Sequence, residues 1–346
     1  MSAAPSPVRG VLVTGVGAPP GLAVLRSLQE SGLDLKLAAA DISPFAGGLH
    51  GHDVPPVVLP RAADAESYLM AVRQACERHG LDVVIPCSEA EVAALAPARK
   101  QFESEFGIRV PVAAPEVIAF GIDKGLLLER VRERGLPAPG TLYPDCADDV
   151  EAWSAGFPCV VKPRSSRGAR GVSYPASMEE LRETWPRTVG DHGASLIQQF
   201  IPGGPDTVYT IGALFDEGRL IASTLHRKLA SNPPSGGAAT AGETVRDPAL
   251  MRAGLAVFEA CGSWHGLTAV ELKRPAPDKP AYLLEINPRM WGFGYLMTMA
   301  GLNMPALLVR MLNGEFAAGR RPDADYGEAR MVRTWRDVPM TPELVS

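Results

Sequence analysis

Long apolar runs, an apolar leader and patterned cysteines are all missing from this sequence. No apolar run approaches the roughly 20 residues of a membrane-spanning helix. Residues 1–7 lack the basic and apolar regions of a signal peptide. The cysteines do not have the spacing of a zinc site or a disulfide framework; they are Cys76, Cys87, Cys146, Cys159 and Cys261. We therefore expect a cytoplasmic protein with reduced thiols and no membrane association.

An excess of positive charge is missing too. The sequence has no long basic run, and its formal net charge is −5. This balance argues against nucleic acid or an anionic membrane as the main partner and favours small molecules. The chain has 346 residues, of which 46% are hydrophobic and 21% charged, as in a soluble globular protein. That length is enough for two or three domains.

The first third of the chain alternates short apolar strands with helical patterns. The predicted strands cover residues 11–15, 35–40 and 82–86, with a short extended segment at 110–112. The predicted helices cover residues 22–30, 65–79 and 89–105. This alternation predicts an α/β domain at residues 1–113, built on a doubly wound parallel sheet.

Two features of this first domain allow a functional interpretation. Gly15, Gly17 and Gly21 resemble a dinucleotide-binding loop, but their spacing is one residue too long for G-x-G-x-x-G. An oxidoreductase would also leave everything after residue 120 unexplained. Ser88 and Glu89 follow the strand at 82–86, at the end of the strand where open sheets usually bind ligands. We favour the alternative in which Ser88 caps the next helix and Glu89 interacts favourably with the dipole of that helix.

The middle of the chain contains candidates for binding phosphate. Asp123 is expected to cap a helix at 125–134, and Lys124 at its positive end suits a phosphate. Lys162 ends a buried-type strand at 159–162, where an unpaired ammonium is costly. The loop at 163–172 holds two glycines, two serines and three arginines, which suit a cover over polyphosphate. The alternative for the loop is a basic turn between strands.

A second group of strands follows. We expect an edge-like strand at 196–201, then a hairpin of strands 207–215 and 219–225. We expect His226 to pack or cap, and Arg227 and Lys228 to bind anions. The Gly- and Pro-rich stretch 231–240 is typical of a substrate loop or lid. The amphipathic segment at 251–261 predicts a helix behind the next hairpin.

That next hairpin joins strands at 268–273 and 282–287 through a proline-rich connection. Its period-two pattern places Glu271 on the same face as Glu285 and Asn287, and roughly across from them. Carboxylate and amide oxygens suit Mg²⁺, which takes its other ligands from water and phosphates. Arg289 just beyond them can neutralise charge on a transferring phosphoryl group. The alternative is an ordinary solvent-facing hairpin.

Taken in order, these motifs resemble the ATP-grasp superfamily over nearly the whole chain. The likeness is greatest to stand-alone carboxylate-amine ligases related to the carbamoyl-phosphate synthase large chain, because Pro-Ser-Gly-Gly at 234–237 and Asn-Pro-Arg-x-Trp-Gly at 287–292 are typical of them. The resemblance implies an ATP-grasp fold of the α+β type at residues 114–318, with a lid subdomain at about 155–200. Residues 319–346 would close the fold, with a strand at 329–335.

The resemblance also implies site roles. Arg289 and Arg227, with Lys228, would stabilise an acyl phosphate, and Glu271, Glu285 and Asn287 would hold one or two Mg²⁺, with Mn²⁺ as a substitute. An amide stands at Gln198 and Gln199 where the family usually has an acid, which leaves the nucleotide preference open. The residues implied in nucleotide binding are Lys124, Lys162, Ser165, Ser166, Gly168, Gly171, Gln198, Gln199, Phe200, Ile201 and Asp206.

The implied reaction is phosphorylation of a carboxylate by ATP, followed by attack of an amine, giving an amide, ADP and phosphate. The partners would be a small carboxylate and an amine, and homodimers are common in the family. Two alternatives stay open. One is a carboxyphosphate-forming or kinase activity like that of carbamoyl-phosphate synthase, although a complete synthase has a duplicated half. The other is a non-catalytic ATP-binding subunit, against which Glu271, Glu285, Asn287 and Arg289 together weigh.

Overall fold

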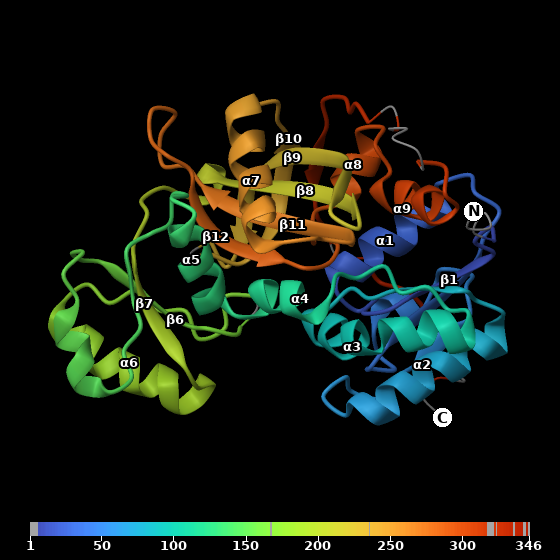
Figure 1. Ribbon diagram of the computed structural model, residues 1–346, viewed down its shortest axis with the longest axis horizontal. Coiled ribbons are helices and arrows are strands. Elements are labelled where there is room, and N and C mark those ends of the chain that lie inside the picture. Colours follow the sequence, from blue (N-terminus) through green and yellow to red (C-terminus); the bar gives the residue numbers. More distant parts are fainter. Residues whose placement is uncertain are drawn as a thin grey trace.

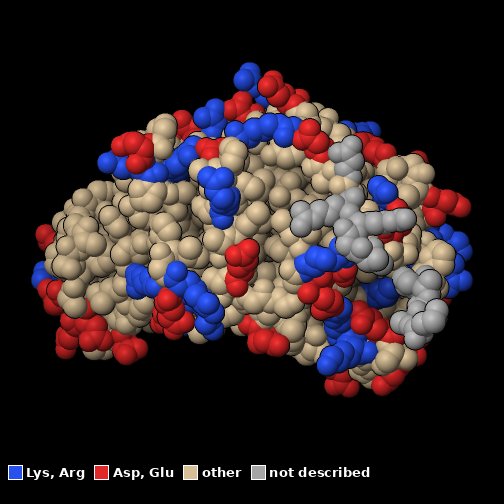
Figure 2. Space-filling model, turned by 45° about the horizontal axis from the view of Figure 1, so that its top comes forward, with Lys and Arg blue, Asp and Glu red and all other residues tan. Residues whose placement is uncertain are grey.

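The chain folds around three sheets, which Figure 1 shows with their covering helices. The computed structural model describes residues 6–166, 168–234, 236–316, 322, 324–334, 336–341 and 344. None of the helices in these ranges is both long and apolar enough to cross a membrane. On the face shown in Figure 2, acidic and basic side chains of the described residues are interspersed.

The first sheet is parallel, with strand order β3-β2-β1-β4, and confirms the predicted α/β fold of the N-terminal part. Helix α1 begins at Pro19 rather than at residue 22, because proline is well tolerated in a first helical turn. Residues 110–112 form no strand, although Arg109 bridges to Val83. The strands are β1 (Gly10–Val13), β2 (Lys36–Asp41), β3 (Pro56–Val58) and β4 (Val83–Ile85), and the helices are α1 (Pro19–Gln29), α2 (Ala65–His79) and α3 (Glu89–Phe106).

Both faces of this sheet are buried. Leu12 and Val84 pack into one core with residues of α2 and α3. Val11 and Val13 pack into a second core with residues of α1, α8 (Tyr295–Met299) and α9 (Met304–Leu312). Alternate strand residues therefore serve opposite cores, which is the arrangement expected of a doubly wound sheet.

The second sheet is antiparallel, with order β12-β11-β8-β9-β10-β13, and forms the floor of the candidate site. Helix α7 (Pro248–Cys261) packs behind β11 and β8, as predicted. The expected loop at 231–240 is shorter, because β9 continues to Asn232 and β10 begins at Ala238. The strands are β8 (Val208–Asp216), β9 (Arg219–Asn232), β10 (Ala238–Thr244), β11 (Gly266–Lys273), β12 (Tyr282–Asn287) and β13 (Arg330–Val332). β13 lies inside the strand predicted at 329–335, of which Trp335 is outside the described residues.

The third sheet, at the left of Figure 1, forms a small lobe with order β5-β7-β6. Its strands are β5 (Thr141–Leu142), β6 (Cys159–Pro163) and β7 (Ser195–Gln199), and helix α6 (Met178–His192) packs on β6 and β7. The strand predicted as edge-like is β7, which instead lies in the centre, because β5 pairs with it on the far side from β6. Helices α4 (Pro115–Ile122) and α5 (Lys124–Glu133) connect this lobe with the first sheet.

A glycine on β8 makes room for a tryptophan at the edge of the site. A Cβ built on Gly212 would lie 2.0 Å from Cη2 of Trp291, which is itself buried. We expect Gly212→Ala to lower the free energy of unfolding by about 1–3 kcal/mol, because the ring has no space to shift within a packed core. Thermal and urea denaturation would measure the change.

Gly190 on α6 is the matched control for this substitution. It is exposed, and nothing lies within 4 Å of a Cβ built on it. Gly190→Ala should raise the free energy of unfolding by about 0.5–1 kcal/mol, because glycine is costly within a helix. Equal destabilisation by both substitutions would contradict the steric explanation.

Candidate active site

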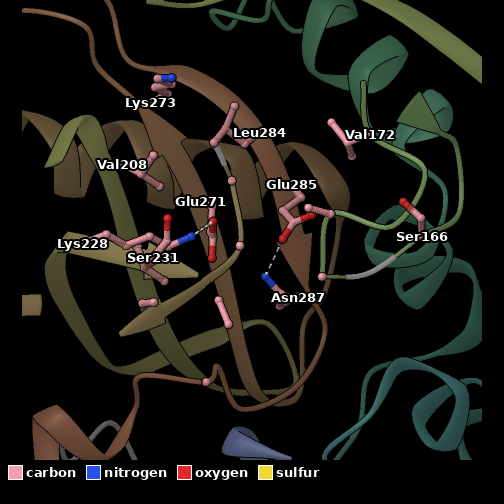
Figure 3. A pocket seen from close by; sticks show the side chains of 18 of the residues that line it. Ser166, Val172, Val208, Lys228, Ser231, Glu271, Lys273, Leu284, Glu285 and Asn287 are labelled. Atoms are coloured by element: carbon pink, nitrogen blue, oxygen red, sulfur yellow. Dashed lines mark hydrogen bonds and ion pairs between the residues drawn. The ribbon is translucent and has the colours of Figure 1, made fainter. Parts of the chain in front are cut away.

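A cavity of about 970 Å³ lies where the second and third sheets face each other, with the end of the first sheet at its border. Pro19, Pro20 and Glu89 come to it from the first sheet's connections, and Lys162 and Gln198 from the third sheet. The second sheet contributes the carboxylates that Figure 3 shows pointing into the cavity. Residues from every sheet thus meet at one place.

The two predicted metal-binding carboxylates lie directly across from each other. Glu271 on β11 pairs in register with Glu285 on β12, and both line the cavity. Asn287 Nδ2 donates a hydrogen bond to Glu285 Oε1 at 3.4 Å, as Figure 3 shows. The predicted hairpin geometry is therefore confirmed, because the three side chains share one face of the sheet.

Three lysines surround these carboxylates. Lys228 Nζ donates to Glu271 Oε2 at 2.7 Å. Lys124 Nζ lies 3.8 Å from Glu285 Oε2 and donates to the backbone oxygen of Ser166 at 2.8 Å. Lys162 is buried nearby on β6. The lysines thus balance the carboxylates from three places, which are β9 of the same sheet, helix α5 and β6 of the third sheet.

The charges around Glu285 keep it ionised. Burial alone would raise the pKa of its carboxyl, but Lys124, Lys228, Lys162 and Arg289 outweigh burial and lower that pKa. Burial likewise opposes the charged form of Lys228, but Glu271 raises its pKa. These groups are therefore held in their charged forms, which are the forms that bind a metal ion and phosphates.

Lys162 behaves differently. Burial, and then the neighbouring charge of Lys124, lower its pKa to about 8, although Glu285 acts in the opposite direction. Lys162 therefore loses its proton as the pH rises through about 8. We expect ADP binding to weaken by about 10-fold between pH 7 and pH 9.5, because a phosphate loses a charge-assisted hydrogen bond with that proton.

Isothermal titration of ADP across this pH range would measure the effect. In the Lys162→Gln variant, ADP should bind more weakly at pH 7 and the change between pH 7 and pH 9.5 should disappear. A pH dependence that persists unchanged in this variant would show that another group is responsible, such as Lys273, whose pKa is also lowered by burial.

Arg289 links the second sheet to the first. Its Nη2 forms an ion pair with Glu89 Oε1 and donates to Asn287 Oδ1 at 2.9 Å. Glu89 begins α3, where Ser88 is the N-cap of a capping box, so the predicted cap is confirmed. The predicted phosphate-facing arginine is thus fixed in place by an acid 200 residues earlier in the chain.

The structure does not bring Arg227 to the cavity, and we correct that prediction. Arg227 Nε donates to Glu243 Oε1 at 3.1 Å, and Arg227 is absent from the described residues that line the cavity. Its neighbours His226 and Lys228 do line it. Adjacent residues of a strand point to opposite faces, so only one side of this basic stretch can serve the site.

Three residues that the resemblance implies in nucleotide binding, Gln198, Gln199 and Phe200, line the cavity. Gln198 Nε2 donates to Thr141 Oγ1 at 3.2 Å, and Gln199 Oε1 accepts from the backbone N–H of Gly140 at 3.2 Å. Phe200 has the ring of Tyr174 edge-on at 6.0 Å and the ammonium of Lys273 at 5.3 Å. Lys273 and Tyr174 also line the cavity but were not predicted as site residues.

The predicted phosphate loop and the nucleotide-binding residues expected after it are only partly at the cavity. Of the predicted positions, Ser165, Ser166, Gly168, Phe200 and Ile201 line it. Gly171 and Asp206 are not among the described lining residues, although Val172 and Pro205 are. Arg167, which also belongs to the predicted loop, lies outside the described residues. Asp123 caps α5, as predicted, and pairs with Arg164 at 2.9 Å.

An aromatic wall closes the end of the cavity near Arg289. We use this name for His226, Trp291 and Phe293. The His226 ring stacks with Trp291 at 6.3 Å and with Phe293 at 6.1 Å between ring centroids. Burial, and then Lys228, lower the pKa of His226 to about 3, so this imidazole is neutral. His226 packs, as predicted.

The donor set fits Mg²⁺. Among the described residues, no cluster of three or more His, Cys, Asp or Glu side chains could hold a metal ion. Glu271 and Glu285 supply two carboxylates, and Asn287 lies beside them with its Nδ2 toward Glu285 and its Oδ1 accepting from Arg289. Two carboxylates with room for phosphate oxygens and water are what Mg²⁺ prefers in nucleotide sites. Glu271, Glu285 and Asn287 would hold the ion, which would neutralise charge on bound phosphates.

Comparison with known proteins gives matches over parts of the sequence. Residues 195–333 match a family described as ATP-grasp in the biosynthetic pathway with Ter operon. A D-alanine–D-alanine ligase from Methylococcus capsulatus is 33% identical over 115 residues, which cover 31% of this chain and 35% of that protein. The chain spans about a third of the length of the first curated relatives that it matches.

Comparison with solved structures extends the likeness to most of the chain. An L-amino acid ligase from Bacillus licheniformis has a TM-score of 0.68 and 21% identity, over 89% of this chain and 74% of that one. The biotin carboxylase domain of 2-oxoglutarate carboxylase from Hydrogenobacter thermophilus was solved with MgADP, ADP and bicarbonate. It has a TM-score of 0.70 and 16% identity, over 93% of this chain and 72% of that one. At these identities the likeness shows a shared fold. The sequence likeness to an ATP-grasp family therefore covers residues 195–333, and the likeness in fold covers most of the chain.

Proposed function

We propose that this protein is an ATP-dependent carboxylate-amine ligase that forms an amide through an acyl phosphate and releases ADP and phosphate. The observation that carries the proposal is the facing pair Glu271 and Glu285, with Lys124 of α5 and Lys228 of β9 around it and Arg289 beside it. A nucleotide-binding protein without turnover does not need an arginine fixed beyond the metal-binding carboxylates. A transferring phosphoryl group does need one.

The nucleotide is expected to span the cavity from Phe200 to Glu285. Lys124 and Lys162 would bind the phosphates, with Ser165, Ser166 and Gly168 covering them, and Gln198, Gln199 and Ile201 would border the base. Bound Mg²⁺ would neutralise charge on the phosphates and act as a Lewis acid. The MgADP in the similar carboxylase domain supports this assignment of the cavity.

The proposed reaction has two steps. In the first, a carboxylate oxygen of the acid attacks the γ-phosphorus of ATP, and the bond to the ADP oxygen breaks. In the second, the amine nitrogen attacks the acyl carbon, the carbon–oxygen bond to phosphate breaks, and the amine proton leaves with the phosphate. Arg289 would hold the transferring group, and the loop at 163–172 would exclude the water that hydrolyses an acyl phosphate.

ADP release from Mg²⁺-ATP tests the proposal. The protein would be mixed with pooled amino acids and other small carboxylates, with and without pooled amines, and with bicarbonate alone. The proposal predicts ADP release that requires an acid and is fastest with both an acid and an amine. ADP release with bicarbonate alone would favour carboxyphosphate chemistry. ATP binding without acid-dependent release in any pool would favour a non-catalytic ATP-binding protein.

A further inference from the structure

Arg333 is a cationic side chain at the cavity that the proposed reaction leaves without a role. It follows β13 at the edge of the second sheet, where its backbone N–H donates to the Thr240 oxygen at 2.7 Å. Two residues earlier, Met331 pairs with Gly242, on which the Phe293 ring rests. Strand alternation therefore places the Arg333 side chain on the cavity face, and Arg333 lines the cavity.

The Arg333 guanidinium is held over the aromatic wall. Its carbon lies 5.3 Å from the centroid of the Phe293 ring. Its Nη1 donates to the Ala239 oxygen at 2.8 Å, and its Nη2 donates to the Gly292 oxygen. Two backbone oxygens and a ring face fix its position, and N–H groups remain for a further acceptor because guanidinium has five.

Among the residues that the structure describes, no carboxylate pairs with this guanidinium. The ion pairs among the described residues include Arg289 with Glu89 and Lys228 with Glu271, but none includes Arg333. Burial lowers the pKa of Arg333, and no charged group of the described residues acts against it. A partly buried cation without a counter-ion is unfavourable, whereas a bound anion would compensate it.

The position of Arg333 relative to Arg289 indicates which anion Arg333 binds. Arg289 lies beside the proposed metal-binding carboxylates, whereas Arg333 bonds to Gly292, beyond Trp291 and next to Phe293. A ligand that reaches Arg333 therefore extends past the reacting centre and along the aromatic wall. Guanidinium groups bind carboxylates through paired hydrogen bonds.

We infer that Arg333 binds a carboxylate of the amine substrate, so that the amine joined in this site is itself an amino acid. This inference rests on the proposed ligase function. It names Arg333 as a specificity-determining residue, and it excludes simple alkylamines and amino acid amides as preferred amines.

The test separates activation of the acid from use of the amine. Hydroxylamine carries no carboxylate and traps an acyl phosphate as a hydroxamate, so hydroxamate formation reports the first step alone. Each amino acid and each other small carboxylate of the pools used for ADP release would be tested as the acid with hydroxylamine and Mg²⁺-ATP. With an acid found in this way, amide formation would be measured with L-alanine against L-alaninamide, and with L-glutamate against L-glutamic acid 1-amide.

The variants would be Arg333→Gln and Arg333→Lys. Arg330→Gln is the matched control, because Arg330 lies on the same strand but is exposed and pairs with Glu243 on the opposite face. We expect Arg333→Gln to raise KM for the amino acid used as the amine by about 10- to 100-fold, because it removes a charge-assisted hydrogen bond to the carboxylate. KM for the amide, and hydroxamate formation, should change less than about 3-fold. Arg333→Lys should restore part of the loss.

Each of the following four outcomes would overturn the inference. If Arg333→Gln raises KM equally for the amino acid and its amide, Arg333 has a structural role. If it raises KM for the acid in the hydroxamate assay, Arg333 contacts the activated substrate. If the unaltered protein uses amide and amino acid equally, no carboxylate is recognised. If no acid yields a hydroxamate in the unaltered protein, the proposed ligase function itself fails, and this inference fails with it.

Discussion

Replacing Glu285 with glutamine is expected to lower acid-dependent ADP release by about 1,000-fold, because a metal ion that neutralises a phosphoryl group contributes several kcal/mol to catalysis. The amide keeps the size of the side chain and its position opposite Glu271. It removes the negative charge that Lys124 and Lys228 stabilise. Steady-state ADP release with saturating Mg²⁺-ATP and acid would measure the loss.

Glu243→Gln is the matched control for this variant. Glu243 lies on the same sheet but faces away from the cavity, where it pairs with Arg227 and Arg330. We expect it to keep ADP release within about 3-fold of the unaltered protein, since surface ion pairs contribute little. Thermal denaturation of both variants would verify that they are folded. Similar losses of activity in the two variants would contradict the assignment of the metal site.

Arg289→Lys is expected to lower kcat by about 100- to 1,000-fold, because it removes a preorganised hydrogen-bond donor to the charge that develops in the transition state. Lysine keeps the positive charge, but its ammonium cannot contact Glu89, Asn287 and a phosphoryl oxygen at once, as the planar guanidinium can. KM for ATP should change little, because the proposed phosphate contacts of Lys124 and Lys162 remain. Steady-state kinetics with varied ATP would separate the two parameters.

Arg227→Lys provides the comparison for Arg289. The two arginines were predicted to have the same role from sequence, yet Arg227 pairs with Glu243 on the far face of the sheet. Its substitution should leave kcat within about 3-fold, because the pair it belongs to is away from the cavity. A large loss in Arg227→Lys with a small one in Arg289→Lys would reverse the roles that the structure indicates.

Local patterns in the sequence predicted most of the fold and the hairpin on which we propose the metal site. Helix α2 has the predicted bounds, because Gly80 in the left-handed conformation ends it and Asp64 begins it. The alternation of apolar and polar residues in β11 and β12 predicted that Glu271 lies opposite Glu285, since successive side chains of a strand point to opposite faces. The predicted domain boundaries at residues 113 and 318 stay predictions, as do Mn²⁺ use, the homodimer and the cytoplasmic location.

Long-range contacts could not be predicted in the same way. The pairing of Glu89 with Arg289 depends on how the first sheet meets the second, and no local pattern encodes that. Arg227 was predicted to bind anions together with Lys228 because the strand was expected to end at residue 225. β9 instead continues to Asn232, and strand alternation turns Arg227 away from the cavity. Arg333 lies in a segment with little periodicity, and only its pairing with β10 brings it to the cavity.

Transfer of labelled oxygen tests the central claim most directly. The acid identified by ADP release would be prepared with ¹⁸O in its carboxylate and incubated with Mg²⁺-ATP and the amine. If an acyl phosphate forms, one carboxylate oxygen becomes the bridging oxygen and leaves with the phosphate. Mass spectrometry should then find one ¹⁸O in the inorganic phosphate for each amide formed. Amide formation with unlabelled phosphate would contradict an acyl phosphate and with it the proposed mechanism.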